Sequence, residues 1–208
     1  MVNLTSEEIR RKYDAFARWY DLVVGVPDVL GVQRFRQSLL RRAAGNVLEV
    51  AVGTGKNVPY YPAGCRIVGI DISIEMLKVA RQRAAKLAQQ VSFALADTEV
   101  LPFPDKSFDT VASSLSTCTF PNPLHALREI SRVCRPEGSI LLLEHGRSDR
   151  EWLGRWQDRR DDRHAKQLGC HWNRDTLGIV RDAGLRIVDS KRTFFGIFHQ
   201  IRAEPVKT

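Results

Sequence analysis

Short apolar runs alternate with longer amphipathic stretches along most of the chain. The apolar runs predict buried strands at residues 47–52, 66–70, 91–95, 108–113 and 139–143. Apolar residues that recur every three or four positions predict helices at residues 73–89, 124–133, 150–168 and 174–183. Strands that alternate with helices in this way favour an α/β fold, in which helices cover both faces of a parallel sheet.

The two ends of the chain depart from this alternation. Two helices are predicted before the first strand, at residues 6–20 and 29–43. Two β-rich runs close the chain, and they predict an antiparallel hairpin at the edge of the sheet. We expect the basic pair Lys191 and Arg192 to form the turn of this hairpin.

Composition limits the kind of protein this is. The chain has 208 residues, of which 43% are hydrophobic, so it can bury a core without disulfide bonds. No apolar run approaches the roughly 20 residues of a membrane-spanning helix. The first residues are charged and the four cysteines form no CxxC pair, so we expect no signal peptide, reduced thiols and a cytoplasmic location. The net charge of +8 (32 basic minus 24 acidic side chains) favours an anionic partner or a solvated basic surface.

A glycine-containing turn after the first strand carries the first chemical signal. Gly53 and Gly55 allow the backbone to approach a ligand closely, because they have no Cβ atom. Asp71 follows at the end of the second strand, where a carboxylate can accept hydrogen bonds from both ribose hydroxyls of an adenosine.

Two further acids indicate which adenosine cofactor is bound. Glu49 lies just before the turn, where it would repel a pyrophosphate but would attract an ammonium group. Asp97 follows the third strand and can accept a hydrogen bond from the adenine amine. A third glycine, typical of dinucleotide sites, is missing. This set fits S-adenosylmethionine (SAM), which is cationic and carries no phosphate.

Four sequence blocks resemble those of class I SAM-dependent methyltransferases: LEVAVGTG, GIDIS, ALADTEVLPFPDKSFDTV and LREISRVCRPEGSILLLEHG. The resemblance implies a Rossmann-like, doubly wound seven-stranded sheet of order 3-2-1-4-5-7-6 with strand 7 antiparallel. It also implies a set of SAM-binding residues: Tyr20, Glu49, Gly53, Gly55, Asp71, Ile72, Met76, Asp97, Thr98 and Ser114. Many members of the family have glycine where this chain has Ala51.

The N-terminal run YDAFARWYD, residues 13–21, resembles the lid of quinone C-methyltransferases and bacterial phosphatidylethanolamine N-methyltransferases. Other segments, such as LEHGR and GCHWNRD, resemble animal methyltransferase-like enzymes that act on alkyl thiols. The resemblance implies that residues 1–45 form a helical lid within the same domain as the core, residues 46–208. It also implies a hydrophobic substrate, with Tyr13, Cys118 and Trp172 in its pocket. The helix with Trp19 and several basic residues could also rest on an anionic membrane.

Four residues are candidates for a general base. In order of preference they are His145, which follows the fifth predicted strand, then Glu144, His164 and His171. For each histidine, a structural hydrogen-bonding role is the alternative. His164, Cys170 and His171 lie close in sequence, but their spacing matches no zinc pattern, so we predict no metal site.

We therefore interpret the chain as a SAM-dependent methyltransferase that acts on a lipid-like or small amphipathic acceptor. Phosphatidylethanolamine N-methylation comes first, followed by quinone C-methylation and thiol S-methylation. An NAD-dependent oxidoreductase and a nucleic-acid-binding module are the alternatives from other classes. The charge alone motivates the second of these, and no RNA-binding extension is apparent, so nucleic acid is not the expected partner. The pattern does not indicate an oligomeric state.

Overall fold

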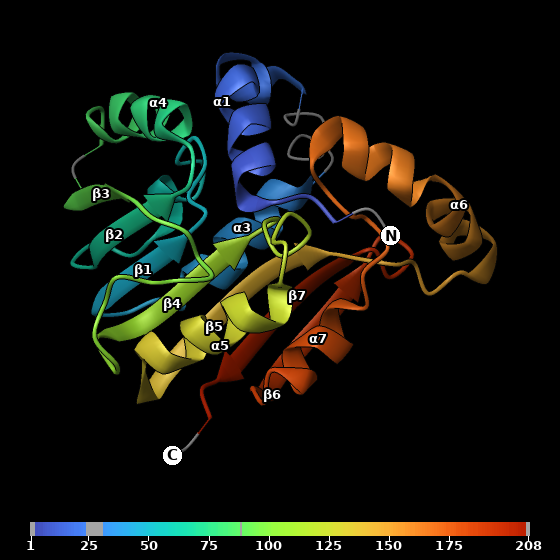
Figure 1. Ribbon diagram of the computed structural model, residues 1–208. Coiled ribbons are helices and arrows are strands. Elements are labelled where there is room, and N and C mark those ends of the chain that lie inside the picture. The colour runs from blue at the N-terminus through green and yellow to red at the C-terminus, as the bar shows by residue number, and fades with distance from the viewer. Residues whose placement is uncertain (1–2, 24–30, 88, 207–208) are drawn as a thin grey trace.

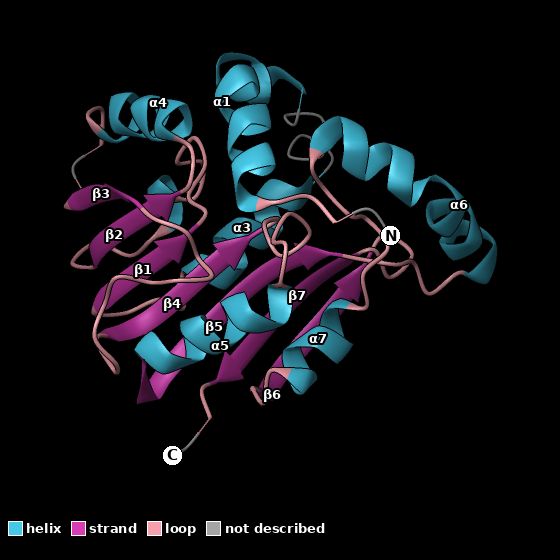
Figure 2. Ribbon diagram, in the orientation of Figure 1, coloured by secondary structure: helices cyan, strands magenta, loops and turns pink. Residues whose placement is uncertain are grey.

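A computed structural model describes residues 3–23, 31–87 and 89–206. Its centre is a single seven-stranded sheet with the order β3-β2-β1-β4-β5-β7-β6 (Figure 1, Figure 2). Strands β1 to β5 are parallel to one another, and β7 runs antiparallel to both of its neighbours. The strands are β1 (Asn46–Val50), β2 (Arg66–Asp71), β3 (Val91–Leu95), β4 (Phe108–Ser114), β5 (Cys134–His145), β6 (Arg186–Thr193) and β7 (Phe198–Glu204). The predicted α/β class, strand order and antiparallel last strand are confirmed.

Helices cover both faces of this sheet and its carboxyl edge. They are α1 (Ser6–Val23), α3 (Gln33–Leu40), the short 3₁₀ helix η2 (Val58–Tyr60), α4 (Ile74–Ala84), α5 (Pro123–Val133), α6 (Glu151–Leu168) and α7 (Thr176–Asp182). α5 and α7 lie on one face and α3 lies on the other, while α1 and α6 lie beyond the carboxyl ends of the parallel strands (Figure 1). The predicted helix at 29–43 is shorter than expected within the described chain, and residues 29–30 lie outside it.

The central strands β1 and β5 bury apolar side chains on both faces because helices cover both faces of the sheet. Leu48 and Val50 belong to the apolar cluster that includes α5 and α7, whereas Val47 belongs to the cluster that includes α3. Strand β5 divides its side chains in the same way, since Ile140 and Leu141 lie in different clusters. This burial explains why the sequence shows continuous apolar runs rather than an alternating pattern.

The expected turn of the terminal hairpin is wrong. Lys191 and Arg192 lie inside β6, where they pair with residues of β7, and the turn comes later, at residues 194–197. Phe194 and Gly196 in this turn have positive φ angles of 49° and 74°. The Phe194 ring contacts the Phe198 ring, with 5.8 Å between their centroids. This aromatic contact stabilises the turn, although phenylalanine is not a typical turn residue.

Candidate functional site

Two adjoining hollows lie at the carboxyl edge of the sheet. The polar hollow runs between the ends of β1, β2 and β4, and most of the predicted SAM-binding residues line it. The apolar hollow lies between α1, α6 and the loops after β4 and β5, with a cavity volume of about 420 Å³. Both hollows are lined by Tyr13, Tyr20 and Leu115, so these three side chains form the boundary between them.

Asp71 ends β2 and faces the polar hollow. Its Oδ2 accepts a hydrogen bond from the Gly53 amide at 2.8 Å, and its Oδ1 accepts one from the Ser73 amide at 2.9 Å. A carboxylate has about four acceptor positions, so each oxygen can still accept a further hydroxyl donor. Burial raises the pKa of Asp71 to about 6. A cationic ligand would favour the ionised form of this carboxyl group.

Glu49, in β1, faces the other end of the same hollow and is 2% exposed. Its Oε1 accepts a hydrogen bond from Asn57 Nδ2 at 2.8 Å, and Asn57 in turn accepts one from the Arg36 guanidinium. Its Oε2 has no hydrogen-bond partner among the described residues. Burial raises the pKa of Glu49 to about 7. A buried carboxylate oxygen without a donor fits the ammonium group of SAM, which would supply charge and hydrogen bonds together.

The two glycines of the turn have different surroundings. Gly53 lines the hollow at a φ of 57°, and a Cβ at this position would meet no atom within 4 Å. Gly55 does not line either hollow; a Cβ there would lie 3.3 Å from Ala80 of α4. Ala51 also has a positive φ, of 48°, and lines the hollow. Gly53 is therefore the glycine that leaves open space beside a ligand, and Gly55 permits close packing of the turn on α4.

The remaining predicted cofactor residues surround the same space. Ile72, Met76, Asp97 and Thr98 line the polar hollow between Asp71 and the loop after β3, and Ser114 lines it from β4. The described lining residues thus offer Glu49 at one end and Asp71 with Asp97 at the other, with apolar walls between them. The two basic side chains among them, Arg36 and Lys56, lie at the Glu49 end. The donor set fits a cationic adenosyl compound without phosphate.

Comparison with known proteins decides the family. A family model described as a methyltransferase domain matches residues 48–142. A phosphatidylethanolamine N-methyltransferase of Cereibacter sphaeroides is 33% identical over 147 residues, which cover 70% of this chain and 72% of that protein. The chain belongs to the family of SAM-dependent methyltransferases. SAM is the cofactor of this family, in agreement with the donor set of the polar hollow.

Other relatives in the methyltransferase family are named for different activities. A demethylmenaquinone methyltransferase of Renibacterium salmoninarum is 33% identical over 143 residues, covering 66% of this chain and 59% of that protein. A yeast mitochondrial methyltransferase, OMS1, is 27% identical over 214 residues; the match covers 93% of this chain but only 45% of the yeast protein. The chain therefore spans only part of the length of several relatives.

Solved structures share the methyltransferase fold at lower identity. The [4+2]-cyclase SpnF superposes with a TM-score of 0.74 at 20% identity, covering 100% of this chain and 98% of that one. A possible histamine N-methyltransferase from Thermotoga maritima gives 0.69 at 22% identity, covering 94% and 99%. These likenesses establish the fold alone, since the same architecture carries different reactions.

Two aspartates fasten α1 over the cofactor site of the methyltransferase. Asp14 accepts a hydrogen bond from the Ser73 hydroxyl at 2.6 Å, beside Asp71. Asp21 accepts one from the Thr54 hydroxyl at 2.7 Å and pairs with Arg83 of α4. Sequence analysis did not assign these aspartates a role, although both belong to the YDAFARWYD run.

The predicted catalytic residues separate into two groups. His145 and His164 line the apolar hollow. Glu144 is fully buried and accepts hydrogen bonds from Ser113 Oγ and from the backbone amides of Ser116 and Thr117, so it anchors the loop after β4.

His171 and Trp172 lie behind the wall of the apolar hollow. His171 Nδ1 lies 2.6 Å from Asp161 Oδ2. Trp172 does not line the hollow: its ring stacks on His164 with 4.3 Å between centroids and contacts Trp156 on α6 at 4.9 Å. Tyr13 and Cys118, the other two predicted substrate residues, do line it. Trp172 therefore supports a wall residue rather than facing the cavity.

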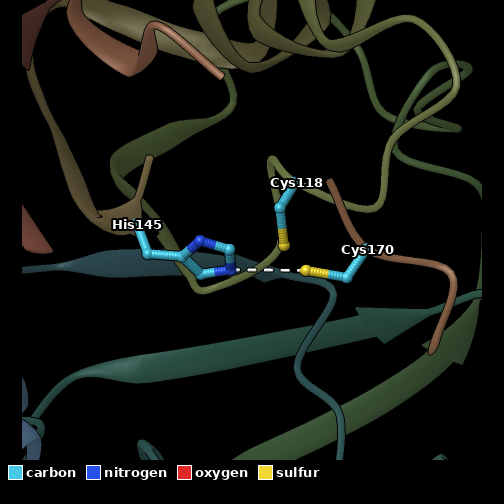
Figure 3. A group of neighbouring side chains, drawn as sticks. All are labelled: Cys118, His145 and Cys170. Atoms are coloured by element: carbon cyan, nitrogen blue, oxygen red, sulfur yellow. Dashed lines mark hydrogen bonds between the residues drawn. The ribbon is translucent and has the colours of Figure 1, made fainter. Parts of the chain in front are cut away.

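A cluster of sulfur and nitrogen atoms occupies the polar corner of the apolar hollow. Cys118, His145 and Cys170 point toward one another, and Cys170 Sγ lies 3.4 Å from His145 Nε2 (Figure 3). His164, Cys170 and His171, which are close in sequence, do not form a cluster of ligand atoms. His164 Nδ1 forms a hydrogen bond with the Cys170 carbonyl, and His171 Nδ1 forms one with Asp161. The residues of the cluster come from the loop after β4, the end of β5 and the loop after α6, so no spacing in the sequence indicates that they meet.

Proposed function

We propose that the chain transfers the methyl group of SAM to an amphipathic acceptor whose apolar part binds in the apolar hollow. The observation that supports this most directly is the shared boundary of Tyr13, Tyr20 and Leu115 between the two hollows. Most of the other walls are apolar or aromatic, including Phe16, Leu168 and Phe198. An acceptor of this shape would gain from burial of its tail beside the cofactor site.

Within this reaction the chain's own residues bind, orient and exclude water. Glu49 would hold the ammonium group of SAM, Asp71 the ribose and Asp97 the adenine amine, while Gly53 leaves room for close approach. When bound, SAM supplies a methyl group activated by a positively charged sulfur. The half-buried Tyr13 and Tyr20 of α1 would keep water out, so that catalysis depends chiefly on alignment of donor and acceptor.

Phosphatidylethanolamine is the acceptor we propose first. Lys12 is the one lysine or arginine among the lining residues of the apolar hollow, and its charge suits the phosphate of a headgroup. His145 lines the same hollow and would take the proton that the ammonium group must lose before it can attack. The identity with the Cereibacter phosphatidylethanolamine N-methyltransferase supports this choice.

A quinone ring is the second candidate acceptor. Tyr13, Phe16, Tyr20 and Phe198 offer aromatic walls on which a flat ring could stack. The relative named as a demethylmenaquinone methyltransferase supports this reading. Because both candidates carry long apolar tails, they share the same requirement for an apolar hollow.

A lipid acceptor requires the site to meet a membrane surface. None of the helices in the described chain has both the length and the apolarity needed to cross a bilayer. Trp19 and Leu22 are 63% and 72% exposed and belong to α1, the helix that borders the apolar hollow. We propose that these side chains insert at the interface of an anionic leaflet during peripheral contact.

The experiment is a transfer assay with methyl-labelled SAM and three acceptor classes: phosphatidylethanolamine vesicles, demethylated quinols and alkyl thiols. Label is expected in the lipid extract with phosphatidylethanolamine, and His145→Ala should lower this turnover without changing SAM affinity. Asp71→Ala serves as the matched control, since it should weaken SAM binding by at least tenfold. Absence of label in all three classes, with SAM binding intact, would overturn the proposal.

A further inference from the structure

We propose that Cys118 Sγ, His145 Nε2 and Cys170 Sγ bind a zinc ion, and that the fourth position of the ion takes a thiolate of the acceptor. The inference rests on the proposed function, because it places the thiolate in the same apolar hollow. It assigns a metal site where the sequence spacing predicts none. It also makes alkyl thiols a class of acceptor for the metal-bound form.

The ligand atoms lie slightly farther apart than they would around a bound zinc ion. The three ligand atoms lie within 4.8 Å of one another, and the Cys170 Sγ to His145 Nε2 distance is 3.4 Å. Tetrahedral zinc, with Zn–S of about 2.3 Å and Zn–N of about 2.0 Å, places ligand atoms about 3.5 Å apart. One contact is already at that separation, so closure needs only small rotations of the cysteine side chains.

The backbone holds the loops together before any ion binds. The His171 amide donates to the Cys118 carbonyl at 2.9 Å, which joins the two cysteine loops directly. Glu144 holds the Cys118 loop through the Thr117 amide, and the Arg174 guanidinium donates to the Thr117 and Phe120 carbonyls. Preorganisation of this kind is what distinguishes a ligand site from a chance encounter of side chains.

The surroundings suit the charges of an occupied site. Two thiolates balance the charge of a zinc ion, and an acceptor thiolate would add one negative charge. The part-buried Arg174 guanidinium, which donates to the Thr117 and Phe120 carbonyls, places a positive charge beside the loop that carries Cys118. All three ligands line the apolar hollow, so a fourth ligand would come from the molecule that occupies it. Three protein ligands with an open position characterise catalytic rather than structural zinc.

The chemistry of the acceptor follows from this site. Binding to the ion would release the thiol proton to solvent, so no general base is needed. The thiolate sulfur attacks the methyl carbon, an S–CH₃ bond forms, and the bond to the donor sulfur breaks with its electron pair returning to that sulfur. The neutral thioether product binds zinc more weakly and can leave. His145 cannot bind zinc through Nε2 and accept a proton there at once, so amine and thiol acceptors require different states of the site.

The test is metal binding by the reduced, full chain, measured without SAM. Dialysis against zinc followed by elemental analysis should give one ion per chain, and cobalt should give the absorption bands of tetrahedral thiolate coordination. Cys118→Ser and Cys170→Ser should each weaken binding at least 100-fold. Cys134→Ser is the matched control, because Cys134 is buried like Cys118 but lies at the start of β5, away from the cluster. Less than a tenth of an ion per chain, or equal losses in all three variants, would overturn the site.

A second arm tests the open position. An alkyl thiol added to the cobalt-loaded chain should shift the absorption bands, whereas the corresponding alcohol should not. An unchanged spectrum would overturn the thiolate assignment even if the metal binds. If the chain binds one metal ion but methylates none of the acceptors, the proposed function is overturned and the zinc site stands. Amine methylation by a chain that binds no metal would support the proposed function and overturn the metal site.

Discussion

The Thr54 hydroxyl donates a 2.7 Å hydrogen bond to the Asp21 carboxylate, which links the glycine turn after β1 to the end of α1. Lys56 Nζ lies 3.6 Å from the same carboxylate, and Arg83 of α4 also pairs with it. The helix that borders the apolar hollow is therefore attached to the turn that borders the polar hollow. Movement of α1 away from the site would have to break this hydrogen bond.

Thr54→Val should loosen the attachment of α1. The substitution keeps the shape of the side chain and removes one hydrogen bond to a charged group, worth about 1.5–3 kcal/mol. We expect SAM to dissociate about tenfold faster or more, because α1 opens more often. Stopped-flow release of SAM measures this rate. Thr54→Ser keeps the hydroxyl and should behave like the wild type; equal rates in all three proteins would mean that α1 does not limit release.

Glu49→Gln should alter the pH dependence of stability. The pKa of Glu49 is raised from 4.5 to about 7 in the folded chain, so folding favours its protonated form. The stability from this preference is present below pH 4.5 and is lost as the pH rises through 7. The free energy of unfolding of the variant should therefore rise relative to wild type, by about 3 kcal/mol between pH 4 and pH 8. Denaturant titrations without SAM at both pH values test this, and a constant difference would contradict it.

SAM should offset the loss of stability that ionised Glu49 causes in the wild type. At pH 8 the ionised Glu49 would pair with the ammonium group of the ligand, so SAM should raise the melting temperature of wild type more than that of Glu49→Gln. SAM affinity of the wild type should fall as the pH drops from 8 to 5.5, since Glu49 and Asp71 both become protonated. Calorimetric titration across this range gives the result. A flat profile would show that neither carboxylate contacts the ligand.

Replacing each glycine of the turn by alanine should affect a different property, SAM affinity for Gly53 and stability for Gly55. Gly53→Ala adds a methyl group in open space at the hollow and strains a left-handed backbone, which costs about 1–2 kcal/mol. Gly55→Ala adds similar strain and also crowds Ala80. We expect Gly53→Ala to lose more SAM affinity and Gly55→Ala to lose more stability. Thermal unfolding and calorimetry on both proteins check this, and the opposite order would contradict the assignment.

Glu144→Gln should disturb the loop after β4 rather than a proton transfer. A glutamine side chain has one acceptor oxygen, so it cannot accept from both the Ser113 hydroxyl and the Ser116 and Thr117 amides, and a lost buried hydrogen bond costs about 1–3 kcal/mol. Stability should therefore fall together with turnover, and the pH profile of the remaining activity should keep its shape. Ser113→Ala, which removes one donor to the same carboxylate, should have a smaller effect of the same kind. A changed pH profile at normal stability would restore Glu144 as a catalytic acid or base.

The fold and the cofactor could be predicted from sequence because their signals are local. The strand–turn–strand unit that carries Glu49, Gly53 and Asp71 is contiguous, and its residue types are those that a cationic adenosyl ligand needs. Helix α4 begins as expected, since the Ser73 hydroxyl accepts a hydrogen bond from the Met76 amide at its first turn. Even Ala51, where glycine is common, adopts the left-handed conformation that the turn requires.

The acceptor side of the site could be predicted only in part, because its residues are distant in sequence. His145 follows an apolar strand and was found by that position, but its contact with Cys170 depends on how α6 ends at Gly169 and returns to the sheet. Trp172 is predicted in the pocket and instead packs against α6, where its indole contacts the rings of His164 and Trp156. Contacts of this kind depend on tertiary packing, which no local pattern reports.

Strand β7 inserts between β5 and β6, so residues 198–204 complete the interior of the sheet although almost the whole chain precedes them. Phe198, at the start of this strand, also lines the acceptor space. During synthesis on the ribosome, strands β1 to β5 can assemble as they emerge, but Phe198 can complete the wall of the apolar hollow only after β7 has been made. A nascent chain should therefore acquire the ability to retain its cofactor before it can hold a molecule to be methylated.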